Sequence, residues 1–332
     1  MKKVVLGLSG GVDSAVSTRL LQNAGYEVHG LFLDIGNPAA RADAEATAAS
    51  LGVALTVADI AAELEKNVCA PFAESYLRGE TPNPCVLCNP SVKFRRLCDM
   101  ADELGAEYIA TGHYARTENG ALLRARSSKD QSYMLCRLRP EQVRRLLLPL
   151  GELEKTQTRA LAAQFGLPVA NKPDSMEICF IPDKDYAAWL ARRGPLPQPG
   201  NIVWNGAVIG RHEGIHRWTV GQRLPGVYDG APLYVVGLRP ETGEVLADRN
   251  EALMKREFCA RAFNWLIDEP DGPVSGAVKV RHSRGDGAPC TAGVLGGGRV
   301  RFRVPDAVRA PAPGQSAVLY DGDRVLGGGF IE

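Results

Sequence analysis

The feature that most constrains the fold is the junction between the first apolar run and the segment after it. Lys3–Leu8 (KVVLGL) predicts a buried β-strand, and Ser14–Ala24 has the apolar spacing of a helix that Gly25 ends. Between them, Gly7–Ser14 (GLSGGVDS) forms a short glycine-rich loop. A strand that enters a helix through such a loop is typical of α/β proteins.

The same alternation continues through the first half of the chain. The further strands that we expect are Glu27–Ile35, Val53–Ile60 and Ala106–Gly112, and the further helices are Ala40–Leu51, 61–77 and Val92–Leu104. This order predicts a doubly wound parallel sheet with helices on both faces. Ligands of such sheets bind at the carboxyl ends of the strands.

The second half of the chain has a different sequence pattern. After about Cys179 come short β-rich runs bounded by Gly, Asn-Gly or Asp-Gly turn signals. They predict one or two small β domains. A chain of 332 residues is long enough for two or three domains in all.

Composition narrows the class of protein. Hydrophobic content of 45% and charged content of 23% are normal for a soluble globular protein, and no run approaches 18 apolar residues. The start of the chain fits a buried strand better than a signal peptide, so we expect a cytoplasmic protein without a membrane partner and with eight reduced cysteines. The net charge of +1 means that a nucleic acid would be held by local basic patches.

The glycine-rich loop has the residues of an anion site. Gly10 and Gly11 let the backbone approach an anion, and the helix behind them presents free N–H groups. Ser9 and Ser14 add hydroxyl donors, and Asp13 suits a phosphate-bound Mg²⁺. The loop lacks the lysine of a Walker A motif. The alternative is an ordinary strand–helix turn.

Two cysteines lie in Thr81–Phe94 (TPNPCVLCNPSVKF), a segment whose prolines and asparagines predict an extended loop. Cys85 and Cys88 are consistent with half of a zinc site, a redox pair or direct reaction with a substrate. The chain has no second Cys-x-x-Cys pair, so a zinc site would need Cys98, Cys179 or a histidine.

The loop resembles the pyrophosphate loop of the ATP pyrophosphatase superfamily. Further segments in the same order extend the likeness over nearly the whole chain, and they make it similar to the tRNA-specific 2-thiouridylase family; they are TPNPCVLCN, TGHYAR, KDQSYML, PLGELEKTQTR, NKPDSMEICFIP, HRWTVGQRLPG, YVVGL and GQSAVLYDGDRVLGGGFIE. The resemblance implies an ATP pyrophosphatase catalytic domain at 1–185, a central β-rich linking domain at 186–250 and a tRNA-binding C-terminal β-barrel at 251–332.

The resemblance also implies a reaction. Such enzymes use ATP and Mg²⁺ to adenylate O2 of the wobble uridine of tRNA, and a protein-borne sulfur then replaces the oxygen. The partners would be tRNA, with the wobble base turned out of its stack, and an upstream sulfur donor protein.

Residues of this chain match the family's site position by position. The matches to ATP contacts are Gly7, Leu8, Ser9, Gly10, Gly11, Val12, Asp13, Ser14, Leu33 and Gly112. The matches to base or tRNA contacts are Asn83, Pro84, Cys85, His113, Lys129, Asp130, Gln131, Arg281, His282 and Gln315. Cys88 matches the first family cysteine, and Cys179 matches the second, which carries the persulfide sulfur.

Cys85 departs from the pattern, because many members carry an aspartate at this position. With Cys85, Cys88 and Cys179 the chain has three candidate thiolate ligands, which suit a [4Fe–4S] cluster with one open iron. Two mechanisms therefore stay open: a persulfide relay through Cys179, and sulfide delivery by a cluster.

The segment Leu33–Ala49 is a second departure, because it is shorter than the family pattern and has leucine where a methionine usually contacts adenine. The alternative function is that of a paralogous ATP-dependent sulfurtransferase with a small-molecule or other RNA acceptor. A further alternative is an iron–sulfur or zinc protein whose cysteines only stabilise an RNA-binding fold. Candidate basic contacts to tRNA phosphates are Lys93, Arg95 and Arg96 beside the cysteines and the alternating Arg299, Arg301 and Arg303.

Overall fold

The computed structural model describes residues 1–173 and 178–332. They form two compact units, each made of segments that are distant in the sequence. The first unit contains Met1–Val68, the described part of Cys85–Met176, and Asp323–Leu326. The second contains the remaining described residues. The division of the sequence into three domains, at residues 185 and 250, stays a prediction.

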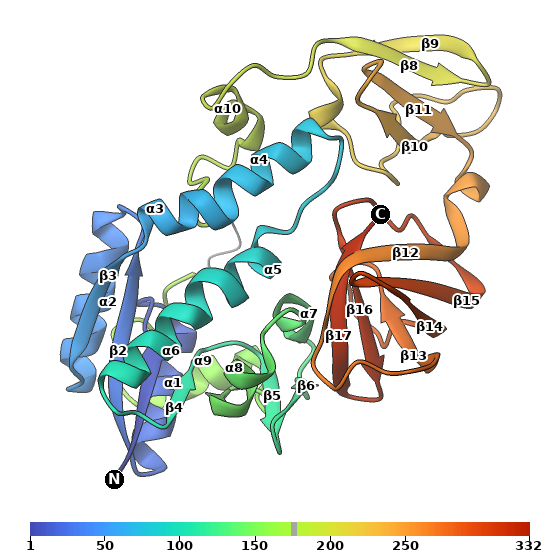
Figure 1. Ribbon diagram of the computed structural model, residues 1–332. Helices are drawn as coiled ribbons and strands as arrows, with labels where there is room; N and C mark the ends of the chain where they lie inside the picture. The colour runs from blue at the N-terminus through green and yellow to red at the C-terminus, as the bar shows by residue number, and fades with distance from the viewer. Residues whose placement is uncertain (174–177) are drawn as a thin grey trace. The chain divides into compact units, whose positions relative to one another are not determined.

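The core of the first unit is a parallel sheet in the strand order β3–β2–β1–β4–β7 (Figure 1). Its strands are β1 Lys2–Gly7, β2 Tyr26–Asp34, β3 Leu55–Asp59, β4 Tyr108–Ala110 and β7 Leu146–Leu147. Val4, Val5 and Leu6 of the central strand β1 are at most 1% exposed, because strands flank it on both edges. The predicted buried parallel sheet is confirmed.

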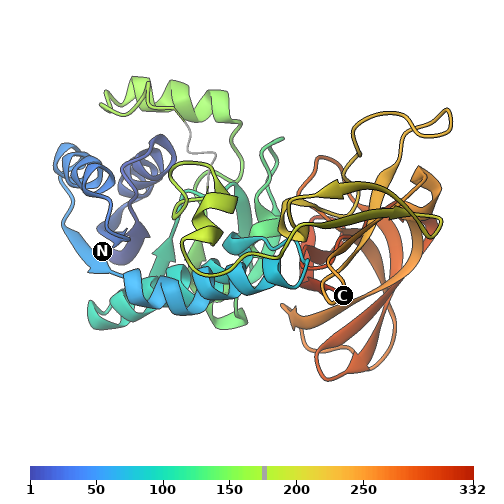
Figure 2. The ribbon, with the colours of Figure 1, turned by 90° about the horizontal axis from the view of Figure 1, so that it is seen from above.

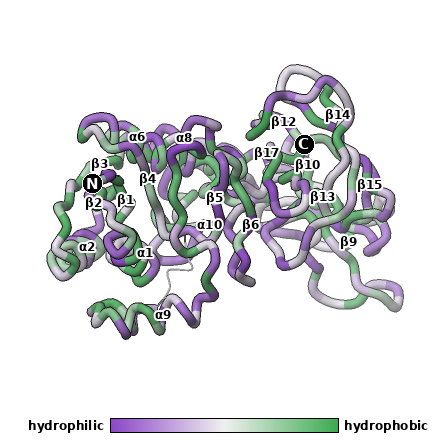
Figure 3. The backbone as a smooth tube through the Cα atoms, turned by 90° about the horizontal axis from the view of Figure 1, so that it is seen from below, coloured by the Kyte–Doolittle hydropathy of each residue, from purple (hydrophilic) through white to green (hydrophobic). Residues whose placement is uncertain are grey.

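Helices cover this sheet on both faces. Figure 3 shows α1 (Val12–Asn23), α2 (Pro38–Leu51) and α9 (Lys155–Gln164) on one side of the strands, and α6 (Phe94–Glu103) and α8 (Pro140–Arg145) on the other. The apolar stripe of α1 packs against α9, with Val12, Val16 and Ala162 in one buried cluster. The doubly wound arrangement is therefore confirmed.

Two longer helical stretches contain a wider π-helical turn. The first consists of α3 (Ala61–Leu64), η1 (Glu65–Cys69) and α4 (Ala70–Leu77), and the second consists of α5 (Pro84–Cys88), η2 (Asn89–Lys93) and α6. The expectation of an extended loop around Cys85 and Cys88 was therefore wrong. Pro84 is the first residue of α5, where its missing N–H removes no helical bond. Pro90 falls in η2, where the wider turn accommodates the break in the hydrogen-bond ladder.

The β-rich half begins with a small sheet in the order β10–β11–β8–β9. Its strands are β8 Gly200–Trp204, β9 Ala207–His212, β10 Tyr234–Arg239 and β11 Glu244–Asp248. Asn205 and Gly206 have φ values of 50° and 78°, and they form the two-residue turn between β8 and β9. The Asn-Gly hairpin signal is thus confirmed.

Six antiparallel strands near the carboxyl terminus form a closed barrel, because β12 pairs with both β15 and β17. They are β12 Met254–Trp265, β13 Val274–Lys279, β14 Ala288–Gly296, β15 Arg299–Arg309, β16 Ser316–Asp321 and β17 Arg324–Ile331. The rings of Phe258 and Phe302 stack at 5.3 Å between centroids, and Phe263 adjoins them. The expected C-terminal barrel is confirmed.

The remaining elements are short. They are β5 Ala115–Glu118, β6 Ala121–Arg124, α7 Ser132–Leu135, α10 Tyr186–Ala191, η3 Ile215–Arg217 and η4 Asn250–Leu253. Figures 1 and 2 show α10 beside α4, where Tyr186 stacks on Tyr76 at 5.0 Å between ring centroids. Among residues 1–173 and 178–332, no helix is both long and apolar enough to cross a membrane.

Candidate active site

The glycine-rich loop joins the carboxyl end of β1 to α1 and is held in a tight turn. Gly10 has a φ of +70°, and a Cβ at this position would lie 2.6 Å from the backbone of Asp43 and Ala44 in α2. The Ser14 hydroxyl donates to the Gly11 carbonyl at 3.1 Å and lies 3.3 Å from the Ser9 hydroxyl. Only glycine fits at position 10, so the loop passes close to α2 and turns into the amino terminus of α1.

Asp13 stands in the first turn of α1, and two neighbours fix its carboxylate. The Tyr114 hydroxyl donates to Asp13 Oδ1 at 2.8 Å, and Lys155 Nζ lies 2.6 Å from the same oxygen. Tyr114 is fully buried and also contacts Thr158 of α9 at 2.9 Å. This network fixes one oxygen of a carboxylate that is 30% exposed at the carboxyl end of the sheet strands.

Gly112 follows β4 and lies against the same loop. A Cβ on Gly112 would stand 2.9 Å from the Asp13 carbonyl carbon. The structure therefore brings Gly112 and the loop together, as expected for two parts of one nucleotide site. Sequence reasoning missed Lys155 and Lys172, which both reach this loop from elsewhere in the sequence.

Lys172 links the loop to α2. Its ammonium donates to the Gly10 carbonyl at 3.1 Å and pairs with Asp43 of α2 at 2.5 Å. The two contacts tie the loop to α2. No sequence pattern signals this brace, because Lys172 is 162 residues from Gly10.

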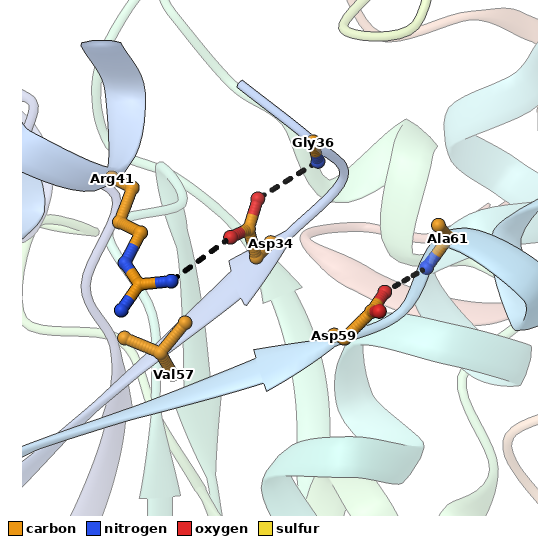
Figure 4. A pocket seen from close by; sticks show the side chains of 6 residues that line it. All are labelled: Asp34, Gly36, Arg41, Val57, Asp59 and Ala61. Atoms are coloured by element: carbon orange, nitrogen blue, oxygen red, sulfur yellow. Dashed lines mark hydrogen bonds and ion pairs between the residues drawn. The ribbon is translucent and has the colours of Figure 1, made fainter. Parts of the chain in front are cut away.

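Leu33 is half-buried near the end of β2, and a pocket of about 340 Å³ begins at the next residue. Figure 4 shows its lining, which consists of Asp34, Gly36, Arg41, Val57, Asp59 and Ala61. The Asp34 and Asp59 carboxylates accept from the backbone N–H groups of Gly36 and Ala61 at 2.8 and 2.9 Å. This polar pocket lies at the carboxyl ends of β2 and β3, which is the edge where nucleotides bind to such sheets.

His113 is held in one orientation beside the loop. Its Nδ1 lies 2.7 Å from the Thr111 hydroxyl, and its ring stacks on Phe94 at 5.9 Å between centroids. Burial, with a smaller contribution from the Lys93 charge, lowers the pKa of His113 well below its ordinary value. The imidazole is therefore neutral at physiological pH.

Cys85 and Cys88 both lie on α5, three residues apart, so the two thiols are on neighbouring positions of one helix face. Cys85 is exposed and Cys88 is half-buried, whereas Val86 between them is fully buried. Burial raises the pKa of Cys136 and of Cys290 to about 12, so those two thiols stay protonated. Cys85 is the exposed thiol of α5, whereas Cys88 is half-buried, as Cys98 of α6 is.

Cys179 is an exposed cysteine of the second unit. The next residue, Phe180, packs edge-on against Phe72 of α4 at 5.5 Å and lies 5.3 Å from Trp189 of α10. Ile181 is 2% exposed. The aromatic cluster anchors the chain immediately after Cys179, and the preceding part of the NKPDSMEICFIP motif, residues 174–177, lies outside the described residues.

Three of the expected tRNA contacts, Lys129, Asp130 and Gln131, lie in one loop that is held by hydrogen bonds within the protein. The Asp130 carboxylate accepts from the backbone of Ala125 and from Ser132, and Gln131 Oε1 accepts from the Tyr114 N–H at 2.9 Å. Lys129 lies over the Tyr114 ring at 5.6 Å. Asp130 and Gln131 therefore shape the loop that presents Lys129.

The other expected contacts lie in the second unit. Arg281 and His282 are exposed in the loop after β13. Gln315 instead directs its amide to the Thr81 carbonyl at 2.9 Å, two residues before Asn83. Gln315 thus contacts the segment that leads to Asn83 and Pro84.

Several of the candidate arginines already have carboxylate partners. Glu63 pairs with Arg95 at 3.6 Å and with Arg96 at 2.6 Å. On β15, Arg299 pairs with Glu332, while Arg301 and Arg303 pair with Glu257. Lys93 makes no ion pair with a described residue, so it is the better candidate for a phosphate contact beside the cysteines.

The positions of the side chains bear on the metal hypotheses. In the part of the chain that the structure describes, no three His, Cys, Asp or Glu side chains lie close enough to hold one metal ion. Cys85 and Cys88 belong to the first unit and Cys179 to the second, so neither unit by itself contains the three thiols of the cluster hypothesis. Asp13 alone fits a different role, as one ligand of a phosphate-bound Mg²⁺.

Comparisons with known proteins cover the whole chain. Three family models match in sequence order: a tRNA methyl transferase HUP domain at residues 2–183, a tRNA methyl transferase PRC-barrel domain at 189–248, and an aminomethyltransferase β-barrel domain at 255–331. A solved 4-thiouridine synthetase–RNA complex with bound ATP matches 58% of this chain and 50% of its own at 20% identity, with a TM-score of 0.37, which is too low to carry an argument.

Curated relatives are similar from end to end. The tRNA-specific 2-thiouridylase MnmA of Syntrophotalea carbinolica is 42% identical over 99% of this chain and 98% of its own length. That of Geobacter metallireducens is 41% identical over 100% of this chain and 97% of its own. On this full-length similarity, the chain belongs to the tRNA-specific 2-thiouridylase family.

Proposed function

We propose that the protein is an ATP-dependent sulfurtransferase that replaces O2 of the wobble uridine in tRNA by sulfur. The observation that carries this proposal is the full-length similarity to relatives named 2-thiouridylases. The geometry of the Gly7–Ser14 loop supports it independently, because backbone and hydroxyl donors gather there at the amino terminus of a 12-residue helix.

The first step is activation of the base. Uridine O2 attacks the α-phosphorus of ATP, the bond to the pyrophosphate oxygen breaks, and pyrophosphate leaves. The loop would bind the phosphates through Gly10, Gly11 and the hydroxyls of Ser9 and Ser14, and the Asp13 carboxylate would hold a Mg²⁺ ion, which would supply neutralisation of the phosphate charge. Gly112 lies against the backbone that follows this loop, because a Cβ there would come within 2.9 Å of the Asp13 carbonyl carbon.

The second step replaces the activated oxygen. We assign the transferred sulfur to a persulfide on Cys179, whose terminal sulfur bonds to C2 while the C2–O bond breaks and AMP leaves. Release of the 2-thiouridine requires a second thiol, and we assign that role to Cys88: its thiolate attacks the Cys179 sulfur, the S–S bond to the base sulfur breaks with its electron pair leaving on the 2-thiouridine, and a Cys88–Cys179 disulfide forms. An external dithiol reductant then returns both cysteines to thiols. A sulfur donor protein then reloads Cys179 with sulfur.

The target base must leave its stack to reach these groups. We propose that Asn83, Pro84 and Cys85 contact the flipped base and that neutral His113 offers a hydrogen bond to it. Lys129 and the exposed Arg281 and His282 are proposed to contact the tRNA backbone, which is a role that exposed basic side chains suit.

An activity assay with cysteine variants tests the proposal. Cys88→Ala and Cys179→Ala are expected to lose thiolation by at least about 10³-fold while ATP and tRNA binding stay within about twofold of wild type, since the changes remove a reacting sulfur only. Cys259→Ala in β12 is the matched control and should retain activity. Full activity of either reacting-cysteine variant would contradict the assignment.

A second experiment separates the persulfide relay from an iron–sulfur cluster. Protein purified without oxygen is assayed for iron and for thiolation with a persulfide donor. The relay predicts full activity without iron. Activity that depends on about four irons per chain, and that Cys85→Ala abolishes, would overturn the relay in favour of a cluster.

The identity of the sulfur acceptor can be tested in cells. Thio-nucleoside analysis of RNA from a strain lacking the protein should show loss of 2-thiouridine. An unchanged 2-thiouridine content would contradict this acceptor and favour a small molecule or another RNA.

A further inference from the structure

The segment HRWTVGQRLPG at 216–226, which the proposed reaction does not use, has a positive charge that no carboxylate neutralises. Residues 214–228 contain Arg217 and Arg223 but no aspartate or glutamate, in a chain whose 39 cationic and 38 anionic side chains almost balance. Both arginines are exposed, and neither makes an ion pair with a described residue. Exposed cations of this kind attract polyanions.

A third arginine lies at the turn between these two. Arg309, at the end of β15, donates to the Gly221 carbonyl at 3.2 Å and to Asn250 Oδ1 at 2.9 Å. Its guanidinium lies over the Tyr234 ring at 5.1 Å from the centroid. All of these partners are uncharged, so the charge of Arg309 adds to that of the two exposed arginines.

Buried neighbours hold the two exposed arginines in an ordered segment. Ile215 and Leu224, each 1% exposed, belong to one apolar cluster, and Trp218 packs against it. Between them, the Gly221 N–H donates to the Val235 carbonyl at 2.8 Å. A ligand that binds here therefore does not have to order the backbone first, which would weaken its binding.

The turn between the arginines lies against the segment that leads to Asn83. The Thr219 hydroxyl contacts the Thr81 hydroxyl at 3.1 Å, and η3 packs against α4. Burial raises the pKa of Tyr186, while the nearby Arg217 charge acts in the opposite direction. Thr81 is two residues, or at most about 7 Å of chain, from Asn83. All of these residues belong to the second unit, so the positive charge lies beside residues that we assign to the target base.

We propose that Arg217, Arg223 and Arg309 form a binding surface for RNA phosphates beside the target base. The three charges attract the backbone, and the guanidinium groups of Arg217 and Arg223 donate to phosphate oxygens. The inference rests on the proposed function, since it assigns this surface to the tRNA of the same reaction. Phosphate contacts position a nucleic acid without reading its sequence, so the surface contributes affinity and register.

The test uses the full-length protein and a tRNA transcript with uridine at the wobble position, with fluorescence anisotropy as the measurement. In the double variant Arg217→Gln with Arg223→Gln, the dissociation constant for tRNA should rise about 10- to 100-fold, because two charge-assisted contacts are lost. The slope of log K against log salt should decrease in magnitude by about 1.4 to 1.8. Arg217→Lys with Arg223→Lys keeps both charges and should retain the salt slope.

Lys3→Gln is the matched control, because Lys3 is an exposed cation at the amino end of β1. Its loss changes the net charge as much as either single arginine substitution does. Lys3→Gln should bind tRNA with wild-type affinity and salt slope. In all variants the thermal midpoint and the calorimetric affinity for ATP should match those of wild type, since the substituted side chains are exposed.

The outcomes separate this inference from the proposed function. Equal tRNA affinity and salt slope in wild type and the double glutamine variant would overturn the inference alone. An equal loss in Lys3→Gln and in Arg217→Gln would overturn it too, because net charge would then explain the effect. Unchanged tRNA binding with lost persulfide loading from the donor protein would assign the surface to an acidic protein instead. A wild-type protein that binds no tRNA would contradict the proposed function itself.

Discussion

At the scale of single residues, the site depends on a glycine whose conformation and surroundings both exclude a side chain. Gly10 combines a φ of +70° with backbone atoms of α2 only 2.6 Å from the position of a Cβ. Gly25, just after α1, has a φ of +85° but open space around its Cβ position. A side chain at Gly25 would therefore meet only an unfavourable backbone conformation, whereas a side chain at Gly10 would also meet a steric clash.

Alanine substitutions at these two glycines should differ in kind. Gly25→Ala should lower the free energy of unfolding by about 1–2 kcal/mol, from the left-handed backbone alone, and leave ATP binding unchanged. Gly10→Ala should cost more stability and abolish ATP binding, because the loop must move away from α2. Denaturant titration and calorimetry measure both quantities; intact ATP affinity in Gly10→Ala would contradict the role of this turn.

At the scale of elements, strand β12 and two loops of the β-rich half hold the segment that leads to Asn83. Within the second unit, Arg261 of β12 pairs with Glu80 at 2.7 Å, and the Thr81 N–H donates to the Pro313 carbonyl at 2.8 Å. Gln315 donates to the Thr81 carbonyl, and the Thr81 hydroxyl contacts Thr219 at 3.1 Å. Gln315 therefore positions this segment in the structure, in addition to the tRNA contact that family resemblance implies.

Gln315→Ala is expected to loosen that segment. Amide hydrogen exchange of residues 79–83 should accelerate about 5- to 10-fold, as expected for the loss of one hydrogen bond of about 1 kcal/mol. Thiolation should fall with it, while ATP binding is kept.

Arg281→Ala provides the comparison, since Arg281 lies in an exposed loop of the same unit. It should weaken tRNA binding without changing exchange in residues 79–83. Equal exchange rates in Gln315→Ala and wild type would limit Gln315 to a direct contact with tRNA.

At the scale of the whole molecule, the folded state favours the neutral form of four histidine rings. Burial lowers the pKa of His29, His113, His212 and His216 from the ordinary value of 6.5. Below pH 6.5 the unfolded chain therefore binds more protons than the folded chain does. The stability contributed by these rings is complete above pH 6.5 and is lost as the pH falls from there toward the lowered native pKa values.

The temperature at the midpoint of thermal unfolding should accordingly decrease as the pH is lowered from 7.5 to 5. His216, whose ring is 1% exposed and without a hydrogen-bond partner among described residues, should account for part of this slope. His216→Phe is expected to flatten the pH dependence, whereas His282→Phe, in an exposed loop, should retain it. Identical slopes in all three proteins would show that buried histidines do not govern acid stability.

Local patterns predicted much of the fold because their causes are local. The buried strand Val4–Leu6, the glycine-rich turn and the Asn205–Gly206 hairpin all follow from apolar runs and from residues that tolerate positive φ. Around Cys85 the same reasoning failed. Pro84 and Pro90 suggested an extended loop, but one occupies the first turn of a helix and the other a π turn, where neither prevents helix formation.

By itself, the amino-acid sequence determined the alternation of strands and helices, the position of the glycine-rich loop at the end of the first strand, and the family. Only the tertiary structure decided which distant side chains serve that loop. Lys155 reaches Asp13 because α9 packs on α1, and Gln315 reaches Thr81 because the barrel closes beside it. Contacts between residues so far apart depend on the packing of whole elements, and periodicity and turn signals carry no information about that packing.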